Sequence, residues 1–373
     1  MMRNPLLIAF FLFLAATPAV GQSYFVSPST YATQWGGGGN CFPYGMTSPY
    51  WRYQQIHSDL PSSVGIILGM AWRRQNTTNT HPATTYNMRF LLSTAATPPT
   101  SASTVFSANH GSDLVSVFYG SGGPGSYQAV NWPATNPPTS GVAPFEYKIT
   151  FNRPFIYKKK ALCWEVRIKG IQRSTTTNFY IDYTGRANSP YVSRIKWTGT
   201  SLVPGLQADY LPIAGAACTA SDQSAIAVMT QSNTLTSGTW TINLGGAALK
   251  KNSTALYIMG NSTTSWGAIP LPFLFPGSST CGVYTQPIIL GPGGATDGTG
   301  AITAAPLQLA DSPALTGLTI HTHWLCLDQG RPLGVISSRG FSLTWPGPGG
   351  GILPDTAQGV WNGQGLITRF EVR

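Results

Sequence analysis

The alternation of apolar and polar residues with a period of two is the feature that most constrains what this chain can fold into. In "FEYKITF" (145–151) each apolar residue occupies an odd position, and in "LCWEVRIK" (162–169) each large apolar residue occupies an even position. Successive side chains of a strand point to opposite faces, so these segments predict half-buried antiparallel strands. In the second segment, the residues expected to face water are Cys163, Glu165, Arg167 and Lys169.

The segments between these strands indicate the fold class. The chain contains 42 glycines and 29 prolines, and no long amphipathic pattern predicts a helix. Short strands separated by clusters of Gly, Pro, Asn and Ser are typical of sandwiches and barrels. We therefore predict an all-β fold: two antiparallel β-sandwich modules, jelly-roll-like or Ig-like, in tandem after a signal peptide.

The composition changes near residue 212. Charged and aromatic strands dominate before this point, and the chain after it is almost uncharged and richer in Gly, Ala, Thr and Leu. A chain of 373 residues is also long enough for two domains at about 150 residues each. The predicted organisation is a signal peptide over 1–21, a first sandwich over 22–211, a second over 212–345, and a Gly/Pro-rich segment with a terminal strand over 346–373. That strand fits either sandwich.

The first residues predict export. "MMRNPLLIAFFLFLAATPAVGQS" has a positive start, an uncharged apolar run and small residues before Gln22, which is the pattern of a secretory signal peptide. The run is shorter than the ~20 apolar residues of a spanning helix. We expect cleavage near Gln22, a secreted, periplasmic or surface location, and no transmembrane anchor in the mature chain.

The charge balance argues against nucleic acid as a partner. The formal net charge of +10 arises mainly from a shortage of acids, since only 12 are present, and the basic residues are scattered. No basic stripe or nucleic-acid-binding motif accompanies the charge. The 12% aromatic content likewise argues against a disordered chain.

The five cysteines fit an oxidising compartment. Cys41, Cys163, Cys218, Cys281 and Cys326 form no CxxC motif and no zinc-finger spacing. Export favours disulfides, but five is an odd number, so at least one thiol is left over. The sequence alone leaves several pairings open.

The second half of the chain resembles a small β-sandwich at the ends of uncharacterised exported bacterial proteins of planctomycete-like genomes. The resemblance is carried by "GAACTAS" (215–221), "LPFLFPGSSTCGVYTQP" (271–287), "GGATDGTGAIT" (293–303), "SPALTGLTIHTHWLCLD" (312–328) and "SSRGFSLTW" (337–345). It implies a disulfide between Cys218 and Cys281, and it offers no established activity and no catalytic residue to carry over to this chain. "PFEYKITFNRPFIY" with "LCWEVRI" resembles, more weakly, the sandwich that often precedes it.

His321 and His323 come nearest to a metal site. Two residues apart on a strand, they share one face, as two ligands of one ion would. Asp328 and Cys326 lie on the opposite parity, so no third ligand is close in sequence. We predict no metal and no cofactor, and we expect both rings on the more polar face of a strand.

No catalytic motif is present. The chain lacks GxSxG, HExxH, a P-loop and GxGxxG. Glycoside hydrolysis commonly uses two carboxylates, and Glu146 and Glu165 are the nearest candidates. Beside Lys148 and Arg167, they are better explained as members of cross-strand charge pairs. We therefore assign no catalytic residue.

Aromatic residues in predicted loops suggest a binding role. Trp35, Trp132, Trp266 and Trp361 lie beside Gly, Pro or Ser clusters, where exposed rings would stack on sugars. The alternative is that these rings cap the ends of the sandwiches, because tryptophan is usually largely buried. The favoured function is a secreted or surface-associated, non-enzymatic binding or structural protein with polysaccharide or another extracellular polymer as its partner. The alternative function is a secreted hydrolase that acts on glycans.

Overall fold

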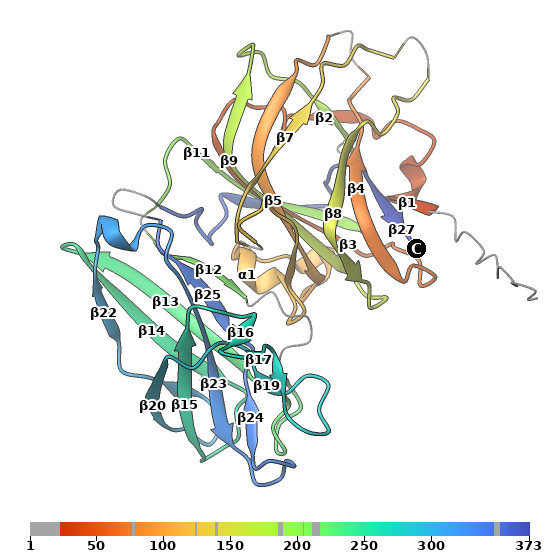
Figure 1. The fold of residues 1–373 in the computed structure, drawn as a ribbon. Helices are drawn as coiled ribbons and strands as arrows, with labels where there is room; N and C mark the ends of the chain where they lie inside the picture. The colour runs from red at the N-terminus through yellow and green to blue at the C-terminus, as the bar shows by residue number, and fades with distance from the viewer. Residues whose placement is uncertain are drawn as a thin grey trace, which may run out of the picture.

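The protein has an all-β fold built from antiparallel sheets, which confirms the predicted class (Figure 1). The computed structural model describes residues 23–76, 79–123, 125–138, 141–185, 189–203, 205–210, 217–346 and 351–373. The predicted signal peptide and the predicted boundary at residue 212 lie outside these ranges. The helical segments are α1 (Phe106–Asn109), η1 (Ser29–Tyr31), η2 (Pro99–Ser101) and η3 (Pro313–Leu315). Within the described ranges, none of them has the length and apolar character needed to cross a membrane.

Strand pairing divides the described strands into two groups, which we call the first and the second β region. The first contains a four-stranded sheet of order β1-β27-β4-β8, a seven-stranded sheet of order β26-β11-β3-β9-β5-β6 with β7 also on β5, and the pair β10-β2. Its strands are β1 (Ser23–Ser27), β2 (Gly38–Asn40), β3 (Tyr50–His57), β4 (Ile66–Trp72), β5 (Thr84–Thr94), β6 (Val115–Phe118), β7 (Gln128–Trp132), β8 (Tyr147–Ile156), β9 (Leu162–Arg173), β10 (Ile181–Tyr183), β11 (Val192–Gly199), β26 (Gly359–Asn362) and β27 (Thr368–Val372).

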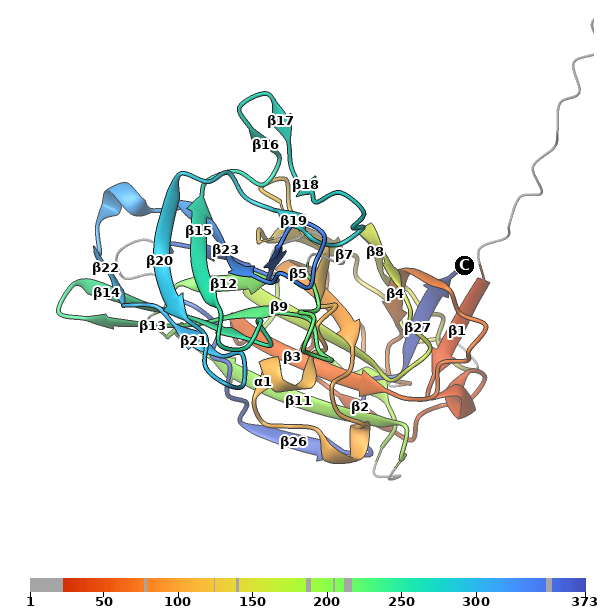
Figure 2. The same ribbon diagram turned by 90° about the horizontal axis from the view of Figure 1, so that it is seen from below.

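The second β region contains a six-stranded sheet of order β12-β25-β23-β15-β20 with β24 also on β23, a four-stranded sheet of order β13-β14-β21 with β22 also on β14, and the pairs β16-β17 and β18-β19. The β16-β17 hairpin projects from this region in Figure 2. The strands are β12 (Gln207–Tyr210), β13 (Val228–Thr236), β14 (Thr239–Ala247), β15 (Thr254–Gly260), β16 (Ser265–Trp266), β17 (Ile269–Pro270), β18 (Phe273–Leu274), β19 (Gly282–Val283), β20 (Ile289–Ala295), β21 (Ile302–Thr303), β22 (Leu307–Ala310), β23 (Thr319–Leu327), β24 (Val335–Ser337) and β25 (Phe341–Thr344).

The two ends of the described chain lie side by side in the first β region. β27 pairs with β1 on one side and with β4 on the other, and β26 pairs with β11. The blue β27 and the red β1 are therefore neighbours in Figure 1. The terminal strand, which the sequence left free to join either sandwich, thus completes the first region after the chain has passed through the second.

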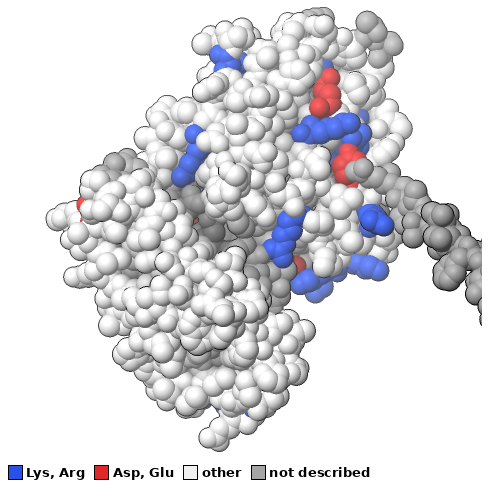
Figure 3. Space-filling model, in the orientation of Figure 1, with Lys and Arg blue, Asp and Glu red and all other residues white. Residues whose placement is uncertain are grey.

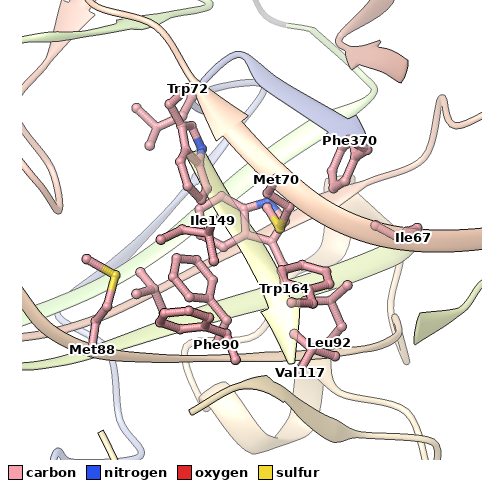
Figure 4. Packing of buried hydrophobic residues seen from close by; sticks show 14 of the residues in the cluster. Ile67, Met70, Trp72, Met88, Phe90, Leu92, Val117, Ile149, Trp164 and Phe370 are labelled. Carbon is pink, nitrogen blue, oxygen red and sulfur yellow. The ribbon is translucent and has the colours of Figure 1, made fainter. Parts of the chain in front are cut away.

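The segments with alternating apolar and polar residues fold as strands, and their apolar side chains are buried. Tyr147, Ile149 and Phe151 of β8 are buried, as are Trp164 and Val166 of β9. They meet between the four-stranded and seven-stranded sheets in a core rich in aromatic rings, where Trp72, Phe90 and Trp164 face one another (Figure 4). The ring centroid of Trp72 lies 5.6 Å from that of Phe90 and 5.6 Å from that of Trp164. Each such ring buries on the order of 200 Å², so this cluster is the main apolar contribution to the stability of the region.

The opposite parity of β9 is not exposed, which corrects the prediction. Cys163 and Glu165 are fully buried because this face of the seven-stranded sheet is covered as well. Phe106 of α1 packs there against Cys163, with Ala357 and Val360 of the C-terminal segment nearby. Alternation revealed the two faces of β9, and the long-range packing of α1 and residues 357–360 decides that Cys163 and Glu165 are buried, whereas Arg167 and Lys169 of the same face stay partly exposed.

The second β region has a separate apolar core. Trp240, Trp324 and Trp345 are buried in it, together with Leu244 and Ile336. Tyr257 meets Trp324 edge to face with ring centroids 5.8 Å apart. Each region thus buries its own cluster of large side chains.

Candidate binding cleft

A cleft of about 450 Å³ lies between the two β regions. The first region contributes Arg52 of β3, together with Arg167 and Lys169 of β9. The second contributes residues 229–233 of β13, and Ile352, Leu353 and Asp355 of the C-terminal segment also line it. This volume is in the usual range for pockets that bind small molecules, about 300–1,000 Å³.

The strand register gathers polar groups beside the cleft, of which Arg52 and Arg167 line it. β3 and β9 are antiparallel neighbours in which Arg52 lies opposite Arg167, and Gln54 lies opposite Glu165. Residues two apart on a strand share a face, so these four side chains project together, away from the aromatic core. The sequence signal was the alternation of polar residues in "YWRYQQIH", which the sequence analysis did not use.

Glu165 is the centre of this group. Its Oε1 accepts from Arg52 Nε at 2.8 Å and from Arg167 Nε at 2.5 Å. Its Oε2 accepts from Gln54 Nε2 at 3.2 Å and lies 3.1 Å from Nε2 of His110, the residue that follows α1. The cross-strand cation that Glu165 contacts is Arg52 of β3, which the sequence did not lead us to name. β8 and β9 lie in different sheets, however, so Glu146 and Glu165 do not form a cross-strand arrangement.

The electrostatics keep Glu165 ionised. Burial of the carboxylate works to raise its pKa, but the Arg52 and Arg167 cations and the hydrogen bond from His110 outweigh it and hold the pKa well below the usual range. A general acid for glycoside cleavage needs the opposite, a raised pKa. Glu165 is therefore suited to fixing the two guanidinium groups at the cleft floor and not to donating a proton.

Asp355 connects the C-terminal segment to the same cluster. Its Oδ1 lies 2.9 Å from Arg52 Nη1 and accepts the backbone N–H of Ser107 at 3.0 Å. Its Oδ2 accepts from the Ser107 hydroxyl at 2.5 Å. Asp355, which lines the cleft, and Glu165, which does not, thus both have their carboxylate oxygens engaged by donors. The arrangement presents cationic and hydroxyl groups and no carboxylate pair poised for acid–base work.

The four predicted tryptophans do not form one site, and none lines the cleft. Trp132 is wrong as a stacking residue: it ends β7 and is 5% exposed, because it packs among Tyr44, Tyr86 and Tyr147. Trp266, on the β16-β17 hairpin, is 41% exposed. Trp35 is half-buried near Arg73, and Trp361 is half-buried near Arg194 and Lys196.

Of the two histidines of β23, one differs from expectation. His321 is partly buried with its Nδ1 2.7 Å from the hydroxyl of Ser342. His323 is fully buried, and neither of its ring nitrogens has a partner. The ring of Tyr284 lies 5.3 Å away, because the 261–288 segment covers this face of the sheet. The prediction of a polar face is therefore wrong for His323. No group of three possible metal ligands occurs among the described residues.

The disulfide implied by the family resemblance is present. Cys218 and Cys281 are bonded across a sequence separation of 63 residues. Cys41 is a partly buried free thiol, and Cys163 and Cys326 are buried free thiols. Burial raises the pKa of each of these three thiols, so they are poor nucleophiles at neutral pH.

No protein-family model matches the chain, and no curated protein matches it.

Proposed function

We propose that this is an exported, non-enzymatic protein that binds a polysaccharide in the cleft between its β regions. The observation that supports the proposal is the lining of the cleft: guanidinium and ammonium groups on one wall, and the amide and hydroxyl side chains of β13 on the other. Such groups donate hydrogen bonds to sugar hydroxyls and acid groups, and a cleft open at the surface accommodates a continuing chain.

Two features support export. The N-terminal sequence has the pattern of a signal peptide, and the Cys218–Cys281 disulfide belongs in an oxidising compartment. The hydrolase alternative has weaker support, because Glu165 is held in an ion cluster and Asp355 is occupied by Arg52 and Ser107.

A glycan array probed with the oxidised mature chain tests the proposal. Two variants alter the cleft from opposite walls: Lys169→Ala removes a cation, and Ser232→Trp fills the space from an exposed position of β13. We expect retention on at least one polysaccharide class, and at least tenfold weaker binding in both variants. Trp266→Ala, on the distant hairpin, is the matched control and should bind like the parent.

The outcomes separate the alternatives. If Trp266→Ala abolishes retention and both cleft variants keep it, the binding site lies on the β16-β17 hairpin and not in the cleft. Release of reducing sugar from a retained glycan would support the hydrolase instead. A chain retained on no glycan would contradict the proposal.

A further inference from the structure

A second cavity lies in the second β region, away from the cleft. It has a volume of about 380 Å³ and is bounded by the loop 275–281, the turn 331–335 and the Cys218–Cys281 disulfide. Phe275, Leu333 and Val335 give it apolar walls, and Arg331 is the single ionisable side chain in its lining. A cavity of this size with one charged group suits a small amphipathic ligand.

Internal hydrogen bonds hold the backbone of both walls. In the loop, the hydroxyl of Ser278 accepts the backbone N–H groups of Thr280 at 3.1 Å and Cys281 at 2.7 Å. In the turn, Asp328 O accepts from the backbone N–H of Arg331 at 2.9 Å, and Arg331 O accepts from Gly334 at 2.8 Å. Little ordering entropy is therefore lost on binding.

Arg331 carries a charge that the fold does not neutralise. Its Nη2 donates to the carbonyl of Thr219 at 2.5 Å, but its Nε is buried with no partner, and it forms no ion pair among the described residues. Asp328, the nearest acid in sequence, directs its carboxylate to Ser221 and Gly330. A buried guanidinium donor without an acceptor costs free energy that an incoming anion would recover.

The geometry points to a site for a carboxylate on an apolar body. Arg331 would hold the carboxylate through charge-assisted hydrogen bonds, and the body would rest on Phe275, Leu333 and Val335. The hydroxyl of Ser278 accepts two N–H groups, and its own hydrogen has no acceptor within the described ranges, so it is a second donor. One cation matches a monoanion better than a dianionic phosphate. The source of such a group is a free carboxylic acid or the C-terminus of a peptide.

The disulfide contributes to this site directly. Cys281 ends the loop that forms one wall, and Cys218 precedes Thr219, whose carbonyl holds Arg331. The bond therefore links the apolar wall to the segment around Thr219, which holds the guanidinium group of Arg331. We expect reduction of the disulfide to weaken ligand binding.

Calorimetric titration of the oxidised full-length mature chain tests the inference with two ligand pairs. One pair is 3-phenylpropanoate and 3-phenylpropanamide; the other is a tetrapeptide ending in Leu with a free or an amidated C-terminus. We expect one acid to saturate the protein and its amide to bind at least tenfold more weakly, because the amide brings no charge to Arg331. Whichever pair binds tighter identifies the source of the carboxylate.

Protein variants complete the test. Arg331→Gln should weaken binding of the acid at least tenfold, since Gln carries no charge and its amide ends where Nε of the arginine lies, short of the Nη2 position that donates to Thr219 O. Lys251→Gln removes an exposed positive charge of the same region and should leave the affinity unchanged. Equal affinity for acid and amide, full affinity in Arg331→Gln, or no saturation by either acid would overturn the inference. The acid–amide comparison uses the parent protein, so it decides the matter even if Arg331→Gln fails to fold.

Discussion

The two β regions bury polar groups in different ways. In the first, ionised side chains enter the interior: Glu165 sits among arginines, and the ion pair of Arg73 with Asp182, at 2.7 Å, is almost fully buried. In the second, the ion pair of Lys250 with Asp222 is partly exposed, and a disulfide ties the chain together. Almost all coloured side chains on the visible face in Figure 3 belong to the first region.

The difference shows two ways to fix loops onto a sheet. The first region fixes α1 and the C-terminal segment through charges, since Arg52 joins Glu165 to Asp355. The second fixes the 261–288 segment through a covalent bond from Cys218 to Cys281. Breaking a buried ion pair leaves an uncompensated charge in the folded protein. Breaking a disulfide instead raises the conformational entropy of the unfolded chain. The two regions should therefore respond to different perturbations.

The largest effect is expected from Glu165→Ala. Removing this carboxylate takes away the acid that the buried Arg52 and the partly buried Arg167 share, and leaves Arg52 only the partly exposed Asp355, so the expected loss in unfolding free energy is about 3–5 kcal/mol. Asp222→Asn is the matched change in the second region, where the partly exposed pair with Lys250 should be worth at most about 1 kcal/mol. Urea unfolding followed by tryptophan fluorescence measures both. Equal losses would show that the contrast between the regions is wrong.

The next effect is that of the disulfide. Replacing Cys218 and Cys281 together by serine removes a link that spans 63 residues, and a bond of this kind typically contributes about 2–4 kcal/mol. The loss should be confined to the second region, so hydrogen exchange should speed up in β23 and β24 and stay unchanged in β3 and β9. Cys41→Ser, at a free thiol of the first region, is the control. Faster exchange in both regions would mean that they unfold as one unit.

The sequence predicted the fold class because a two-residue period needs no long-range information. It could not predict Glu165 as buried, because the groups that cover it come from α1 and residue 355, distant in sequence. The same limit affected the tryptophans. Trp132 and Trp266 have similar Pro-, Gly- or Ser-rich neighbours, but Trp132 is 5% exposed and Trp266 is 41% exposed. Local composition does not report which loop packs on a core.

The cleft and the Arg331 cavity were out of reach for a related reason. Each brings together segments that are far apart along the chain: β9 with β13 in one, and residues 275–281 with 331–335 in the other. Nothing in the local sequence of either segment indicates that the two come into contact. The pairing of β27 with β1 depends in the same way on the closure of the whole first region.

The smallest expected effect compares two buried histidines. His57, in the first region, has partners: its Nδ1 lies 2.6 Å from Ser27 Oγ, and its Nε2 accepts from Trp164 Nε1 at 3.0 Å. His323 has none. His57→Leu should therefore destabilise the protein at pH 7.5 by about 1–3 kcal/mol, because it leaves buried donors unsatisfied. His323→Leu should instead stabilise it by about 1 kcal/mol, because it removes an unsatisfied polar ring.

The pH dependence gives this comparison a second measurement. Burial lowers the pKa of His323 to about 3, below its value of 6.5 in the unfolded chain. The unfolded state therefore binds the proton first, and stability is lost as the pH falls from about 6.5 toward 3, by up to about 1.4 kcal/mol per pH unit for one group. Thermal unfolding of His323→Leu between pH 7.5 and 4.5 should show a shallower loss than the parent. An unchanged dependence of stability on pH would mean that His323 takes up its proton in the folded state. The conclusion that the 261–288 segment shields its ring from water would then be wrong.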